Sequence, residues 1–461
     1  MNRRTFHVSR FTHHASHVTY VVIASLFLTL CDPAVAAGPP AQRLTLPNGA
    51  RLVVSEQHAI PMVVMQILLD AGARRDPQGR EGLARLTADL LTEGTKARSS
   101  MQISEATDRI GASLGSSADL DYAVLNLTVL KKDLDTGVDL LTDILLRPTF
   151  PDAEVARRRE AALASMKAQE DDPGFVAQRA FTETLFRGEP YGHLVIGTLE
   201  SVRKLSRADV VSFYDEYYHP AQAIITAVGD ITAAEIEDRL QIALRDWRGG
   251  RAMPFQYPTV LPAPHAPVLI DKPITQATII LGHRGIARDN PDYYAVTVMN
   301  FILGGGGFTS RLMENIRTKA GLAYSVGSGF GVNKSPGSFE VVMQTKNESA
   351  NDAIQRACTE IKRMRAELVG DDELNEAKLY LTGSFPLRFD TNAKIAGFFA
   401  QVEFFNLGAD YADTYAQRIN AVTKDEVLRV AQQYLHPDQL LLVVAGNLSQ
   451  AKISPTVPCA M

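Results

Sequence analysis

The sequence is poor in cysteine and contains a single tryptophan. Its three cysteines are Cys31, Cys358 and Cys459, and none of them belongs to a C-x-x-C pair. So few cysteines in a chain of 461 residues exclude a disulfide framework of the kind that holds small secreted domains together. The missing C-x-x-C also excludes a thiolate zinc site of the usual spacing. Cys358 and Cys459 could still pair with each other.

An excess of positive charge is absent as well. The formal net charge is -5, and the lysines and arginines form no long tail, which disfavours nucleic-acid binding. The chain is 46% hydrophobic and 21% charged, as is ordinary for a soluble globular protein. Its length is sufficient for two domains or more.

The apolar run near the N-terminus, Tyr20–Leu30, is too short to cross a bilayer. It follows three arginines within the first ten residues and precedes the small-x-small pattern Ala34-Val35-Ala36. This arrangement predicts a signal peptide over residues 1–36, removed near Ala36 or Ala37. The protein is therefore expected to be exported or periplasmic, with no membrane span after signal removal. The alternative is that the segment is retained as a membrane anchor.

The sequence repeats itself without a gap. "LSRADVVSFYDEYYHPAQAIITAVGDI" at 205–231 aligns with "VTKDEVLRVAQQYLHPDQLLLVVAGNL" at 422–448. Each copy begins with a hydroxyl residue, Ser206 or Thr423, that is typical of a helix N-cap. Each helix is expected to end before a His-Pro pair, and the apolar run that follows predicts a buried strand.

A duplication at this spacing implies two similar α+β domains. We place the N-terminal domain at about 40–248 and the C-terminal domain at 268–450. Residues 249–267, rich in glycine and proline and without a helical period, are expected to form an extended linker.

Several further segments carry a resemblance to a known family. They are "LTLPNGARLVV", "DAGARRDPQGREGLA", "PTFPDAEVARRRE", "EDDP" and "PYGHLVIGT" in the first domain, and "LGGGGFTSRLMENIRTKAGLAYSV" in the second. Together they resemble the pitrilysin and mitochondrial processing peptidase family, the inverted zincins. The resemblance implies two tandem α+β domains, each a mostly antiparallel sheet packed with helices, which form half of a clam-shell peptidase chamber.

Catalytic members of that family hold zinc with two histidines of an H-x-x-E-H motif and a distant glutamate. Here "RLTAD", Arg85 to Asp89, occupies the motif, and Ser165 lies at or near the position of the distant glutamate. One carboxylate beside a guanidinium does not make a zinc site. The remaining histidines of the mature chain are scattered, with no pair at i, i+4 spacing. We therefore expect no metal in this chain.

The stretch "ENIRTKAGLAYSV" retains a different part of the family's machinery. A helix over "SRLMENIRTK" is expected, with Thr309 as its N-cap and Gly321 just past its end, followed by a strand. In the family, an arginine and a tyrosine at the spacing of Arg317 and Tyr324 reach across the chamber to the zinc site. A phenol can donate a hydrogen bond to the oxyanion of peptide hydrolysis, and a guanidinium can hold neighbouring carbonyls. The alternative is a solvated helix-end charge and a rim tyrosine.

The glycine-rich segment before this helix contains Gly304, Gly305, Gly306, Gly307 and Phe308. The family uses such a segment near the substrate path, which makes these residues candidates for substrate binding. No lysine follows in the spacing of a phosphate-binding loop. The alternative is a tight entry into the helix.

In "IGASLGSSADL" the residues Gly115-Ser116 replace the Asn-Ala of the family's substrate-pairing edge strand, which puts that pairing in doubt. The run Arg157–Glu160 is expected to be a solvated helix face.

The leading functional hypothesis is a metal-free subunit of a pitrilysin-family zinc peptidase, inactive alone. A homologous partner with H-x-x-E-H would supply zinc and the base, and the pair would cleave unfolded peptides as a metalloendopeptidase complex, as a heterodimer at its simplest. A second hypothesis is a structural or peptide-binding protein with no catalytic role. A third, a zinc metalloendopeptidase in its own right, needs ligands that the sequence does not show.

Overall fold

The computed structural model describes residues 38–250, 255–257, 266–454 and 459. The chain divides into two units at Gly38, and the second unit, Pro39–Met461, contains nearly all of the described residues. The predicted signal peptide at 1–36 and most of the predicted linker lie outside the described residues. No helix of the described part is long and apolar enough to cross a membrane.

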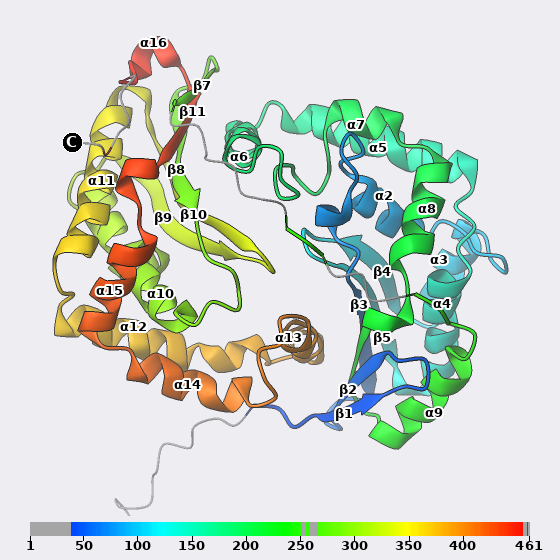
Figure 1. Cartoon of the computed structure of the whole chain (residues 1–461). Helices are drawn as coiled ribbons and strands as arrows, with labels where there is room; N and C mark the ends of the chain where they lie inside the picture. The colour runs from blue at the N-terminus through cyan, green and yellow to red at the C-terminus, as the bar shows by residue number, and fades with distance from the viewer. Residues whose placement is uncertain (1–37, 251–254, 258–265, 455–458, 460–461) are drawn as a thin grey trace, which may run out of the picture. The chain divides into compact units, whose positions relative to one another are not determined.

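The second unit contains two mixed sheets, each with helices (Figure 1). The first sheet has the strand order β1-β2-β6-β3-β5-β4, and only β2 and β6 run parallel. Its strands are β1 (Gln42–Thr45), β2 (Arg51–Glu56), β3 (Met62–Leu69), β4 (Ser113–Ala118), β5 (Ala123–Leu130) and β6 (Ile224–Gly229). The α-helices of this part are α2 (Leu83–Leu90), α3 (Ser100–Arg109), α4 (Leu134–Leu146), α5 (Asp152–Gln169), α6 (Pro173–Leu185), α7 (Leu199–Lys204), α8 (Arg207–Tyr217) and α9 (Ala233–Ala243).

The second sheet has the order β7-β11-β8-β10-β9, and only β7 and β11 run parallel. Its strands are β7 (Val268–Asp271), β8 (Gln276–Arg284), β9 (Ala323–Val332), β10 (Pro336–Lys346) and β11 (Leu441–Gly446). The α-helices are α10 (Tyr293–Asn300), α11 (Ala350–Ala366), α12 (Asp371–Gly383), α13 (Asn392–Phe404), α14 (Tyr411–Ala421), α15 (Lys424–Tyr434) and α16 (Leu448–Ala451). The predicted α+β class with two mostly antiparallel sheets is confirmed.

The internal repeat has the local structure that its sequence predicts. Ser206 and Thr423 each cap a helix, α8 and α15, in a capping box completed by Asp209 and Glu426. The apolar runs after the His-Pro pairs form β6 and β11, whose residues are all buried. Both strands lie inside their sheets with neighbours on either side, which explains why their sequences are continuously apolar rather than alternating.

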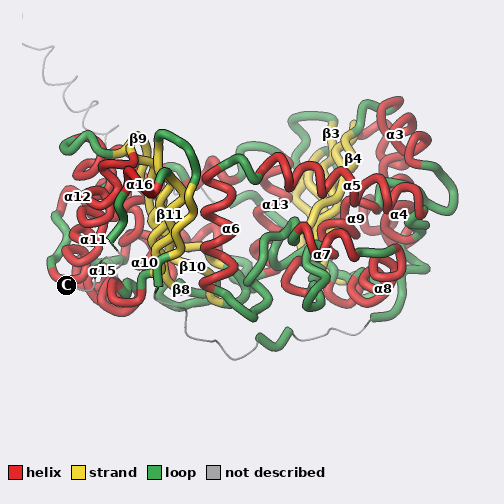
Figure 2. The backbone as a smooth tube through the Cα atoms, turned by 90° about the horizontal axis from the view of Figure 1, so that it is seen from above, coloured by secondary structure: helices red, strands yellow, loops and turns green. Residues whose placement is uncertain are grey.

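Each of the two sheets is covered by one helix that comes from the other half of the chain. From the first half, α6 packs on β8 and β11, where Phe181 joins Ile280 and Val443 in one apolar cluster. From the second half, α13 packs on β3 and β6, where Phe399 joins Val64 in another. Figure 2 shows α6 beside the strands of the second sheet. The sequence did not predict this exchange, and the boundaries at 248 and 268 stay predictions.

A disulfide joins Cys358 of α11 to Cys459, with 5.3 Å between the two Cα atoms. The bridge spans 101 residues of sequence. In the chain-entropy model a loop of this length stabilises the fold by about 4.7 kcal/mol. The pairing that the sequence left open is therefore present, and it fixes the C-terminus to the second half.

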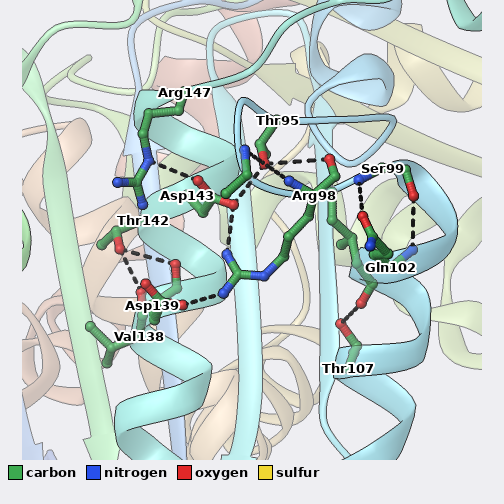
Figure 3. Close-up of polar contacts among 12 residues, drawn as sticks. Thr95, Arg98, Ser99, Gln102, Thr107, Val138, Asp139, Thr142, Asp143 and Arg147 are labelled. Carbon is green, nitrogen blue, oxygen red and sulfur yellow. Dashed lines mark hydrogen bonds and ion pairs between the residues drawn. The ribbon is translucent and has the colours of Figure 1, made fainter.

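Asp143 of α4 is a buried carboxylate that organises the segment between α2 and α3 (Figure 3). It accepts hydrogen bonds from Thr95 Oγ1 at 2.7 Å, Arg98 Nη1 at 2.7 Å and Arg147 Nε at 2.8 Å. Burial alone would raise the pKa of Asp143, but these donors outweigh burial and lower it. The network holds the chain that leaves α2 against α4.

Candidate functional site

The helix α2 carries the residues that stand in place of the zinc motif. Gly82 precedes it in the left-handed region, at φ +95°. The Asp76 carboxylate accepts backbone hydrogen bonds from Gly82 and Ala84, both at 2.7 Å. A side chain in this position satisfies N–H groups that the first turn leaves unpaired, so the helix begins at Leu83.

The three aligned positions of the motif come together in space. Arg85 Nε lies 2.9 and 2.8 Å from the two Asp89 carboxylate oxygens, an ion pair one helical turn apart. Arg85, Asp89 and Ser165 of α5 line one pocket of about 190 Å³. The placement of Ser165 beside α2 agrees with the alignment that the resemblance implied.

Zinc does not fit this donor set. The only carboxylate at the pocket, Asp89, is already engaged by a guanidinium, and Arg85 would repel a dication. Within the described ranges, no group of three or more His, Cys, Asp or Glu side chains is placed to hold a metal. Arg85, Asp89 and Ser165 therefore do not form a zinc site.

A buried carboxylate, Glu93, lies just past the same helix. It accepts hydrogen bonds from Arg157, Arg158 and Ser100. Burial would raise the pKa of Glu93, but the arginine and serine donors outweigh it and lower the pKa. None of the residues Arg157–Glu160 is buried, as expected for a solvated helix face. Two of its arginines, Arg157 and Arg158, in addition neutralise the Glu93 side chain, which is 3% exposed.

The predicted pair in the second half lies side by side, with a third residue of the glycine-rich segment. The Arg317 guanidinium carbon is 4.8 Å from the centre of the Phe308 ring and 5.7 Å from that of Tyr324. Tyr324 is 74% exposed and Phe308 is 68% exposed. Arg317 forms no ion pair with any acid of the described chain. We call these three residues the cation–aromatic cluster.

The backbone around this cluster is irregular. Two π-helical segments, Phe301–Gly305 and Met313–Thr318, flank the glycine-rich turn, and Arg317 lies in the second. Such segments are rare and frequently occur at functional sites. Gly321, at φ +63°, ends the helix as predicted. Thr309 is not the N-cap, because it belongs to a 3₁₀ turn and Ser310 is the extended residue before the helix.

The glycines have two different environments. Gly304, Gly305 and Gly307 line an open groove of about 680 Å³ together with β9, the edge strand of its sheet. A Cβ at Gly304 would lie 2.4 Å from Ser328 Oγ, so only glycine allows this approach to β9. Gly306 instead packs on Phe301 and does not line the groove. The role of all five residues in substrate binding stays a prediction.

Sequence reasoning missed part of the groove. Ser328 and Glu340, on β9 and β10, line it, and the Ser328 hydroxyl lies 2.8 Å from the Asn300 side-chain oxygen. Nothing in the local sequence identifies them as groove residues, because small and polar residues of this kind occur in many edge strands that line no groove. In the first half, β4 forms the sheet edge that the resemblance placed at Gly115-Ser116.

Comparison with known proteins supports the same assignment. Residues 51–199 match the family model described as "Insulinase (Peptidase family M16)", and residues 204–381 match "Peptidase M16 inactive domain". A relative from Streptomyces coelicolor, described as an "uncharacterized zinc protease", is 28% identical over 420 residues, 90% of this chain and 91% of the relative. A Bacillus subtilis protein of the same description is 24% identical, and the alignment covers 88% of this chain and 99% of the relative.

Two solved structures are similar along nearly their whole length. A "peptidase M16 inactive domain" from Pseudomonas fluorescens superimposes with a TM-score of 0.83 at 28% identity, covering 88% of this chain and 98% of the other. A protease from Helicobacter pylori superimposes with a TM-score of 0.81 at 19% identity, covering 88% of this chain and 99% of the other. This similarity shows a common fold. With both family models matched in order and the fold reproduced from end to end, the chain belongs to peptidase family M16, the pitrilysin family.

Proposed function

We propose that this protein is an exported, metal-free subunit that completes the active site of a homologous M16 peptidase chain bearing H-x-x-E-H. The observation that carries the proposal is an asymmetry. The motif in the first half is replaced by the Arg85–Asp89 ion pair, whereas the second half presents an exposed Tyr324 beside the half-buried Arg317.

Each residue of the pair has a definite chemical task. The exposed Tyr324 phenol is free to donate a hydrogen bond to the oxygen that becomes negative when the peptide carbonyl is attacked. The Arg317 guanidinium, oriented by two rings rather than by an acid, keeps its donors for carbonyls of the bound peptide. The partner would supply the zinc and the general base.

The substrate class follows from the groove beside the pair. β9 is an edge strand, and an extended peptide can add to such an edge by backbone hydrogen bonds. The groove next to it is lined by glycines and small residues, which leave room for a peptide backbone. We propose unfolded peptides as substrates, because a clam-shell chamber closed by the partner would exclude folded proteins.

Export is supported by two features. The N-terminal segment has the composition of a signal peptide. The Cys358–Cys459 disulfide is of a kind that forms and persists in oxidising compartments and is rare in the cytosol.

The test is co-expression with an M16 homologue from the same genome that contains H-x-x-E-H. We expect the two chains to co-purify and to cleave an unfolded fluorogenic peptide, with neither chain active alone. Tyr324→Phe should lower kcat by about 10²–10³-fold, the usual cost of one oxyanion donor. Unchanged cleavage by the Tyr324→Phe complex, or full activity of the partner alone, would show the proposal to be wrong.

A second candidate function, peptide binding without catalysis, is favoured by the groove itself, which needs no metal to hold an extended chain. It predicts that the lone chain binds unfolded peptides and that Tyr324→Phe changes neither binding nor any partner's turnover.

A further inference from the structure

The pocket between α2 and α5 holds no set of metal ligands, but two guanidiniums line it. Three charged side chains line it, Arg85, Asp89 and Arg158. Each guanidinium already has a carboxylate partner: Arg85 pairs with Asp89, and Arg158 pairs with Glu93, which lies outside the lining.

The hydrogen-bond donors of the pocket are only partly used. Arg85 engages Asp89 through Nε, and neither of its two Nη atoms forms a hydrogen bond to the described chain. Arg158 meets Glu93 through Nε and Nη2, and its Nη1 forms none in the same part of the chain. The Ser165 hydroxyl also has no hydrogen-bond partner among the described residues. These donors have no acceptor among the described residues, so they can donate hydrogen bonds to the oxygen atoms of a bound anion.

The rest of the wall is apolar. It is formed by Leu86, Ala161, Ala162, Met166, Ile196 and Val202. The pocket volume of about 190 Å³ corresponds to roughly six water molecules at liquid density. Such a space holds a small anionic group and a short branched hydrocarbon, and is too small for a nucleotide or a sugar phosphate.

We propose that this pocket binds a carboxylate carried on a short apolar chain. The carboxylate would meet the Nη donors of Arg85 and Arg158 and the Ser165 hydroxyl, and the hydrocarbon would fill the apolar wall. A planar guanidinium binds a planar carboxylate with two parallel hydrogen bonds, which favours this anion over a spherical one. The two sources of such a group are the C-terminal residue of a peptide and a free short-chain acid.

Substitution of Asp89 is expected to change the carboxylate affinity in a direction that a purely structural role would not predict. In the free protein, Asp89 competes with the ligand for the Arg85 guanidinium. Removing the Asp89 charge therefore strengthens carboxylate binding, while removing the Arg85 charge abolishes it.

The experiment is calorimetric titration of the lone, mature chain with acetyl-Gly-Val, its C-terminal amide, and 3-methylbutanoate. We expect the free acids to bind and the amide to bind at least about tenfold more weakly, since hydrogen bonds to charged groups are the strong ones. Tighter binding of acetyl-Gly-Val than of 3-methylbutanoate assigns the site to peptide C-termini. Equal binding assigns it to free acids, and both results support a carboxylate site.

Three variants complete the test. Arg85→Met should weaken binding of the acids by at least about tenfold, and Asp89→Asn should strengthen it. Arg157→Gln, outside the pocket lining, is the matched control and should change affinity less than about twofold. Equal affinity for acid and amide, or no effect of Arg85→Met in a variant whose thermal unfolding is unchanged, would overturn the proposal. Because no partner chain is present, the outcome is independent of the proposed subunit role.

Discussion

The first half of the chain places a carboxylate against Arg85, whereas the second half places aromatic rings against Arg317. In the first half, Arg98, Arg157 and Arg158 also meet buried carboxylates. In the second, the Arg317 charge is stabilised by ring faces, and its guanidinium donates no hydrogen bond to any other described residue. The contrast indicates that the Arg85 charge is balanced within the chain by Asp89, which leaves only its Nη donors for a ligand, whereas the Arg317 charge has no acid partner among the described residues.

The largest expected effect tests that contrast directly. In the complex with an H-x-x-E-H partner, Arg317→Gln should lower kcat/KM for an unfolded peptide by about 10²-fold, because it removes a charged donor at the reacting centre. Arg85→Gln, the matched change in the first half, should alter kcat/KM less than about twofold for a peptide with an amidated C-terminus, which carries no carboxylate for the pocket between α2 and α5. Steady-state kinetics of both complexes provide the measurement. Similar losses for the two variants would erase the distinction between the halves.

A second prediction concerns acid sensitivity, which differs between the halves. Burial lowers the pKa of His283 to about 4. The hydrogen bond to the Arg284 carbonyl opposes this shift, and the nearby His436 adds to it. His283 is therefore neutral when folded, and its Nε2 accepts the backbone N–H of His436 at 3.0 Å. The unfolded chain takes up this proton near pH 6.5, so stability is lost as the pH falls from about 6.5 to 4, by about 3 kcal/mol.

Denaturant unfolding between pH 7 and pH 4 measures this loss, and His283→Gln should flatten the pH dependence. His58 is the control, because its hydrogen bond to Asp230 raises its pKa. Its contribution is present at low pH and fades as the pH rises, so His58→Gln should leave the acid loss in place. An unchanged slope for His283→Gln would contradict the prediction.

The third prediction addresses the internal charge balance of the first half. Asp143→Asn replaces one acceptor oxygen by an amide NH2 group, a donor that faces arginine donors, and should destabilise the fold by about 1–3 kcal/mol. Asp139, whose side chain is 52% exposed, pairs with the same Arg98, so Asp139→Asn should cost less than about 1 kcal/mol. Urea unfolding of both variants compares them. Equal costs would mean that burial of Asp143 adds nothing.

The smallest effect is expected at Phe308. Phe308→Leu keeps an apolar side chain but removes one of the two ring faces against Arg317, a contribution of about 0.5–1 kcal/mol at an exposed site. We expect kcat of the complex to fall by about two- to fivefold, and Phe308→Tyr to restore it. A loss as large as that of Arg317→Gln would instead assign Phe308 a direct contact with substrate.

Much of the fold could be predicted because its signals are local. The capping boxes at Ser206 and Thr423 and the left-handed Gly321 each depend on a few neighbouring residues. The expectation for Thr309 failed because Gly307–Thr309 forms a 3₁₀ turn, which makes Ser310 the extended residue before the helix. The pairing of Cys358 with Cys459 stayed open because it joins positions 101 residues apart.

The site was predictable only in part for a similar reason. The replacement of the zinc ligands could be read directly from Arg85 to Asp89. That Arg158 would line the same pocket, and that Phe308 would stack on Arg317, depends on how separate elements pack. Whether Arg317 and Tyr324 act on substrate stays a prediction.

The exchanged helices α6 and α13 have a consequence for biogenesis. Because ribosomes make the N-terminal half first, the sheet that contains β3 and β6 is complete in sequence long before α13 exists to cover it. Until α13 has been synthesised as far as Phe404, the apolar surface formed by Val53, Val64 and Val228 is uncovered. An uncovered apolar surface can aggregate or bind a chaperone. Truncation after the first half should thus yield insoluble material, and supplying the missing half as a separate polypeptide should rescue it.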